Sequence, residues 1–64
     1  MLDVPYPQQR ILVRAARRPD QRVSSRNADA LMSLYAADLV SREVLTPAGL
    51  ALARRLLEAD PTLR

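Results

Sequence analysis

The chain has 64 residues, enough for one small domain that buries only about 60% of the surface of its unfolded form. It contains no cysteine and no histidine, which excludes disulfide bonds and thiolate metal sites and removes the commonest general base. A single glycine is too few for a glycine-rich phosphate loop, and no apolar run reaches the roughly 18 residues of a membrane span. We therefore expect one domain over residues 1–64 that is not an enzyme and uses no metal or cofactor. Without a basic leader before an apolar segment, we expect a cytoplasmic location.

The charge of the chain is unevenly distributed. The net charge is +3, and all ten basic residues are arginines. Residues 1–26 hold six arginines against two aspartates, whereas residues 27–64 hold four arginines against five acidic residues. The first half therefore carries the positive charge, which is the electrostatic pattern expected of a protein that binds a polyanion.

The first predicted helix covers residues 7–18, after an extended arm at 1–6. Pro7 suits the first helical position, and Pro19 ends the helix because a residue before proline avoids the helical region. One side of this helix is apolar, with Ile11, Leu12 and Ala15. The opposite side, an arc of about 100°, holds Arg10, Arg14, Arg17 and Arg18. This arginine face is either a solvated surface or a surface that contacts phosphates.

The second predicted helix covers residues 25–37. It follows a turn at "PDQRV" with a short extended piece at Arg22–Val23, and Ser24 or Ser25 is positioned to cap it. Its apolar stripe consists of Ala30, Leu31, Leu34 and Ala37. Asp38 is expected to stop the helix, because aspartate tolerates the left-handed backbone conformation better than most residues.

Residues 39–45 and 46–59 complete the predicted fold. The first of these segments has aliphatic ends around a polar centre, which favours a very small hairpin or an extended crossing. The second is a helix with Thr46 as its cap and Pro47 at its first position, ended by Pro61 before a tail at 61–64. The predicted core is Ile11, Leu12, Ala15, Leu31, Leu34, Leu39, Val44, Leu50, Ala53 and Leu57.

The last helix presents two apolar lines. One consists of Leu50, Ala53 and Leu57, and the other of Leu52, Leu56 and Ala59. A small three-helix domain covers one line easily, so the second needs either a partner or cover from the N-terminal segment. We expect the partner to be a second copy of the chain, in a homodimer whose interface consists of Leu52, Leu56, Arg55 and Ala59.

Residues 9–56 resemble a compressed winged-helix domain of bacterial and phage transcription regulators. The resemblance rests on "LYAADLV" at 34–40, followed by a reduced wing, and on "LTPAG" at 45–49, which starts the last helix. It implies a mainly α fold of three helices with at most a minimal two-stranded β-ribbon before the last helix. One helix fits between Pro19 and Asp38, where the family has two.

The resemblance also implies binding of double-stranded DNA. The helix at 25–37 would enter the major groove, and Ser25, Arg26 and Asn27 would face bases. The phosphate contacts would come from Arg10, Arg14, Arg17, Arg18 and Arg22. Two alternatives stay open: the serines and Asn27 serve only as capping residues beside a solvated Arg26, or the fold binds a host protein instead, as an interaction or inhibitor protein of a phage or bacterium.

Overall fold

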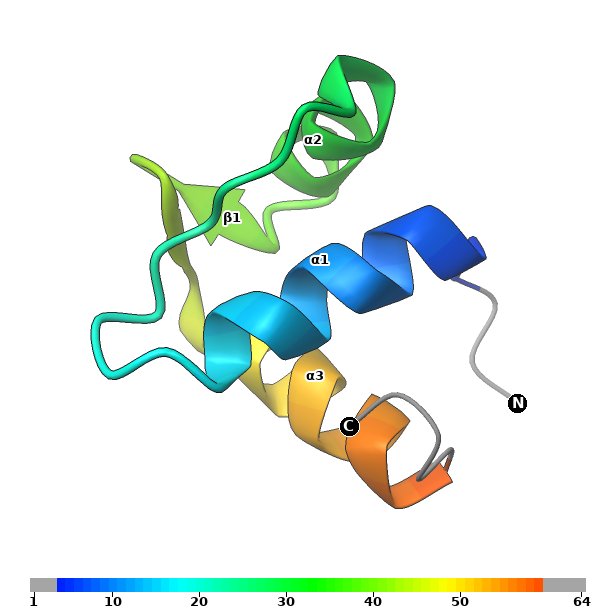
Figure 1. The fold of residues 1–64 in the computed structure, drawn as a ribbon, viewed down its shortest axis with the longest axis vertical. Coiled ribbons are helices and arrows are strands. Elements are labelled where there is room, and N and C mark those ends of the chain that lie inside the picture. Colours follow the sequence, from blue (N-terminus) through cyan, green and yellow to red (C-terminus); the bar gives the residue numbers. More distant parts are fainter. Residues whose placement is uncertain (1–3, 60–64) are drawn as a thin grey trace.

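The computed structural model describes residues 4–59, which form three helices and a small hairpin (Figure 1). The order is α1 (Tyr6–Ala16), α2 (Ala28–Ala36), β1 (Val40–Ser41), β2 (Val44–Leu45) and α3 (Pro47–Ala59). The predicted fold class, mainly α with a minimal ribbon before the last helix, is confirmed. The predicted tail at 61–64 and the helix stop at Pro61 lie outside the described residues. None of the described helices combines the length and apolar character needed to cross a membrane.

Helix α1 is the centre of the fold and lies between α2 and α3 (Figure 1). It begins at Tyr6, one residue before the predicted start at Pro7, and ends at Ala16, two residues earlier than expected. Residues 1–3 of the predicted arm lie outside the described residues. Because helices pack on two of its sides, its buried arc covers roughly 200° of the helix. Val13 is therefore buried along with the three predicted apolar residues.

Helix α2 begins three residues later than predicted. Its cap is Asn27, whose Oδ1 accepts from the Ala30 N–H at 3.1 Å, so the prediction of Ser24 or Ser25 as the cap is wrong. Ser25 instead accepts the Asn27 N–H at 3.1 Å and forms the turn that leads into the helix. An amide oxygen and a hydroxyl can both cap a helix, and here the residue nearest the helix does so.

The end of α2 confirms the predicted role of Asp38. This residue has φ 60°, and its N–H donates to the Tyr35 carbonyl at 3.0 Å. The next N–H, that of Leu39, donates to the Leu34 carbonyl at 3.0 Å. This pair of hydrogen bonds is the Schellman motif, with aspartate in the position that usually belongs to glycine.

The hairpin is tighter than its sequence suggests. Val40 pairs with Leu45 and Ser41 with Val44, so only Arg42 and Glu43 form the turn, at φ 53° and 65°. Two positive φ values in a two-residue loop are typical of a type I′ turn, which usually contains asparagine or glycine.

Two tertiary contacts hold the turn. The Tyr35 hydroxyl accepts the Glu43 N–H at 3.1 Å, and the Glu43 carbonyl accepts the Val23 N–H at 2.8 Å. The extended piece predicted at Arg22–Val23 pairs with β2 through an antiparallel bridge from Arg22 to Val44. The backbone strain of the turn is therefore balanced by hydrogen bonds from α2 and from the segment before it.

Helix α3 starts as predicted. The Thr46 Oγ1 accepts the Gly49 N–H at 3.1 Å, and Pro47 is the first helical residue. The same hydroxyl donates to the Asp38 carbonyl at 2.7 Å, which ties the helix start to the end of α2. Gly49 is needed here because a Cβ at this position would overlap the carbonyl oxygen of Leu39.

The core confirms half of the predicted list. Ile11, Leu12, Ala15, Leu34 and Ala53 are buried, and Leu31, Leu39, Leu50 and Leu57 pack against them while partly exposed. The prediction for Val44 is wrong, since it is 37% exposed. Val40 and Leu45 point into the core instead, because side chains alternate along a strand and a shift of one residue exchanges the two faces.

Candidate nucleic-acid interface

The predicted arginine face of α1 is exposed to solvent. Arg10 and Arg14 lie on the helix itself, Arg17 is its C-cap and Arg18 follows. Their positions follow from the helical period, because the buried arc of α1 leaves only this side to water. The expectation of an exposed face is therefore confirmed for Arg10, Arg14, Arg17 and Arg18.

Two arginines of the predicted phosphate-binding set are engaged by acidic residues. Arg18 Nε lies 3.3 Å from Asp20 Oδ1, and Arg22 Nη2 lies 3.0 Å from Glu43 Oε2. The hydrogen bond from the Arg22 N–H, followed by the charge of Arg18, lowers the pKa of the Asp20 carboxyl. Asp20 therefore stays ionised and keeps Arg18 partly neutralised.

The other basic residues of this half are unpaired within the described chain. Arg10, Arg14, Arg17 and Arg26 have no acidic group of residues 4–59 within salt-bridge distance. Arg10 also lies over the ring of Tyr6, with its Cζ 5.9 Å from the ring centroid, a cation–π geometry that limits the side chain's freedom. These four arginines are the positive charges that a polyanion would meet.

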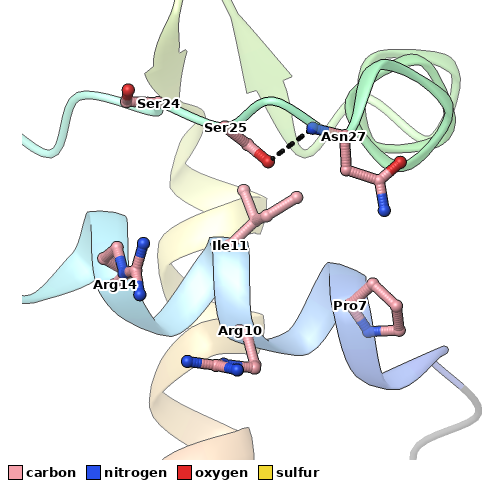
Figure 2. A pocket seen from close by; sticks show the side chains of 7 residues that line it. All are labelled: Pro7, Arg10, Ile11, Arg14, Ser24, Ser25 and Asn27. Atoms are coloured by element: carbon pink, nitrogen blue, oxygen red, sulfur yellow. Dashed lines mark hydrogen bonds between the residues drawn. The ribbon is translucent and has the colours of Figure 1, made fainter.

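Arg10 and Arg14 also line a hollow between α1 and the loop before α2, which we call the α1–loop hollow (Figure 2). Its volume is about 230 Å³, and its lining consists of Pro7, Arg10, Ile11, Arg14, Ser24, Ser25 and Asn27. Figure 2 shows Ile11 pointing from α1 toward the loop that carries Ser25 and Asn27, with the Arg10 side chain on the side of α1 away from that loop in this view. Ser24 belongs to the loop, with its hydroxyl directed away from α1 in that view.

The structure brings together four of the residues predicted to bind nucleic acid. Arg10, Arg14, Ser25 and Asn27 share the α1–loop hollow, although the two segments are separated by ten residues or more of chain. The sequence prediction gave no role here to Pro7, Ile11 or Ser24, because no local pattern indicates that a helix side and a distant loop form one surface.

The prediction of base readout by a helix at 25–37 needs correction. Ser25 and Arg26 precede α2 rather than lie on it, and the Asn27 Oδ1 is occupied as the helix cap. Asp29 is the charged residue of α2 itself, so the helix has no basic group for a base edge or a phosphate. Of the capping roles in the alternative interpretation, the structure shows that of Asn27, whereas Ser25 forms the turn before the helix.

The predicted dimer surface on α3 also needs correction. Leu56 is only 3% exposed and belongs to the core, so its assignment to an interface is wrong. Leu52 is partly buried against the same core, while Arg55 and Ala59 are exposed. The two apolar lines belong to one face of α3, with Gly49, Ala53 and Leu56 buried at its centre and Leu50, Leu52 and Leu57 partly buried toward its edges.

In comparisons with known proteins, no protein-family model, curated protein or solved structure matches the chain. The winged-helix resemblance therefore remains a prediction from the motifs at 34–40 and 45–49. Within residues 4–59, no three carboxylates come together in an arrangement suited to a metal ion.

Proposed function

We propose that the protein is a small DNA-binding regulatory protein that contacts the phosphate backbone of a duplex. The observation that carries the proposal is the group of unpaired, exposed arginines on and near α1: Arg10, Arg14, Arg17 and Arg26. Arginines suit this role because the planar guanidinium donates two parallel hydrogen bonds to phosphate oxygens. The function is binding, with no chemical step.

The order of elements supports the same proposal. A helix, a second helix, a short hairpin and a last helix follow one another as the winged-helix resemblance implies. The two motifs behind the resemblance have structural roles: "LYAADLV" contains the Schellman motif of α2, and "LTPAG" contains the cap and close contact of α3. Because a fold does not fix a function, the arginines remain the main argument.

Direct base recognition is the weaker part of the proposal. Arg26 is the basic residue nearest α2, and the Asn27 side chain retains only its NH₂ group for a base. Contacts to phosphates position a protein without specifying sequence. We therefore expect strong binding to duplexes in general and a small preference among sequences.

The salt dependence of binding tests this function. Four phosphate contacts give a slope of about −3.6 for log K against log salt concentration, which corresponds to roughly 100-fold weaker binding between 50 and 200 mM. Fluorescence anisotropy with a labelled duplex of about 20 base pairs measures this slope. Absence of binding at low salt, or binding that is insensitive to salt, would contradict the proposal.

Substitutions separate the arginine face from general positive charge. The triple variant R10Q/R14Q/R17Q should bind the duplex weakly. Its slope of log K against log salt concentration should be smaller in magnitude than that of the wild type by about 2.7. The triple variant R42Q/R54Q/R55Q is the matched control, because it also removes three exposed arginines and these lie outside the arginine face. Equal losses of affinity in both variants would show that binding depends only on net charge. Circular dichroism verifies that each variant is folded.

A protein partner is the second candidate function, and one observation favours it. Met32 is 70% exposed and Tyr35 44% exposed on the same side of α2, and exposed apolar groups of this kind are common at protein interfaces. The partner would be a host protein or a second copy of the chain. Light scattering during size exclusion tests the homodimer: a monomer at high micromolar concentration, or a dimer that M32E leaves intact, would exclude this surface as its contact.

A further inference from the structure

We propose that the α1–loop hollow is a binding site for one phosphate group. In the complex with DNA, a backbone phosphate would occupy it. The phosphate chemistry follows from the groups that line the hollow, whereas the identity of the phosphate as part of a duplex rests on the proposed function.

The first wall supplies two positive charges without acidic partners in the described chain. Arg10 and Arg14 are one helical turn apart, so their like charges repel one another in the unbound protein. No acidic residue of the described chain lies within salt-bridge distance of either guanidinium. A phosphate between them would remove this repulsion and accept hydrogen bonds from both side chains.

The second wall supplies hydrogen-bond donors, and each of its two side-chain oxygens already accepts one backbone N–H. The Ser25 Oγ accepts the Asn27 N–H, which leaves the hydroxyl proton to donate elsewhere. The Asn27 Oδ1 accepts the Ala30 N–H, which leaves the amide NH₂ group. Both walls therefore present N–H and O–H groups, and this favours an oxyanion over a cation or an amine.

The shape of the hollow agrees with a group attached to a longer ligand. Its volume of about 230 Å³ is several times the roughly 30 Å³ that a water molecule occupies in the liquid, so a phosphate and some of its waters can enter. It is open to solvent on one side, as a phosphate linked to two sugars requires. Ile11, which is 8% exposed, is an apolar part of its lining.

Titration with inorganic phosphate at constant ionic strength tests the site itself. In ¹⁵N NMR spectra we expect saturable shifts of the Ser25 and Asn27 amides and of the Arg10 and Arg14 Nε–H signals. The variant R10Q/R14Q should lose these shifts. The matched control R17Q/R26Q removes the same charge from residues outside the hollow and should keep them. Shifts that are spread over all arginines, or that persist in R10Q/R14Q, would overturn the proposal.

Titration with a duplex identifies the source of the phosphate. R10Q/R14Q should bind at least about 10-fold more weakly than R17Q/R26Q, since it loses the hydrogen bonds of the hollow as well as two charges. If both variants lose affinity equally, the hollow has no special role although DNA binding stands. If the duplex does not bind but inorganic phosphate shifts the hollow, the proposed function fails and the site belongs to a free phosphate compound. If neither binds, both proposals fail.

Discussion

Replacing Gly49 with alanine tests how closely α3 approaches the backbone of Leu39. Helix propensity alone favours the change, because alanine is more stable than glycine within a helix by about 0.5–1 kcal/mol. The tertiary structure predicts the opposite sign. The atoms nearest to a new Cβ are the carbonyl oxygen of Leu39, its carbonyl carbon at 3.0 Å and its Cα at 3.3 Å.

The expected loss follows from the kind of atoms involved. All three belong to the backbone, so no side-chain rotation relieves the overlap and α3 has to move away. Overpacking of this kind costs about 1–3 kcal/mol. The same carbonyl accepts the Thr46 N–H at 3.1 Å, and weakening this hydrogen bond adds about 0.5–1.5 kcal/mol. After the gain in helix propensity, we expect G49A to lower the free energy of unfolding by about 1–3 kcal/mol.

Urea denaturation followed by circular dichroism measures this change. Ala51 provides the control, because it is exposed on the same helix and A51G changes helix propensity without a tertiary contact. A51G should therefore be less stable than wild type by up to about 1 kcal/mol. If G49A were more stable than wild type by a similar amount, the close contact between α3 and Leu39 would be refuted.

Three further changes test the fold and the arginine face. D38G should raise the free energy of unfolding by about 0.5–1 kcal/mol, because glycine adopts the left-handed conformation at φ 60° without steric cost. Urea denaturation measures this change, and a loss of stability would contradict the assignment of this C-cap. L56E should unfold the domain because it places a charge in the core, whereas M32E, at an exposed position, should stay folded; circular dichroism measures both. A folded, monomeric L56E would show that Leu56 lies at an interface between subunits and not in the core. R14Q/R17Q should have a free energy of unfolding within about 0.5 kcal/mol of the wild-type value, as measured by thermal unfolding. A larger loss would show that these arginines stabilise the fold.

The sequence determines the positions of the helices to a large extent, because helix starts and stops are local. Thr46 with Pro47, and Asp38, act through neighbouring backbone groups, and the structure confirms their roles. Pro7 is the second residue of α1 and not the first as predicted, because the helix already begins at Tyr6. The exposure of the arginine face follows in the same way from the period of 3.6 residues. The boundaries of α1 differ from the prediction by one and two residues, and the start of α2 differs by three. The start of α2 is misplaced because three nearby residues offer side-chain oxygens and the sequence does not rank them.

The tertiary structure alone decides which of two adjacent aliphatic residues enters the core. Val40 and Leu45 are buried and Val44 is exposed because a two-residue turn fixes the register of the hairpin. That turn adopts an unfavourable backbone conformation for Arg42 and Glu43. Two hydrogen bonds compensate for it: the Glu43 N–H donates to the Tyr35 hydroxyl, and the Val23 N–H donates to the Glu43 carbonyl. These partners are distant in sequence, so no local pattern predicts the register.

The candidate site is likewise determined partly by the sequence and partly by the tertiary structure. That the first half of the chain presents arginines to solvent is determined by composition and helical period. The packing of α1 beside the loop before α2 decides which of these arginines remain unpaired. It also decides that Arg10 and Arg14 line the same hollow as Ser25 and Asn27. The physical reason is that a local pattern fixes the side of a helix on which a residue lies, whereas its neighbours across a gap depend on how separate segments pack.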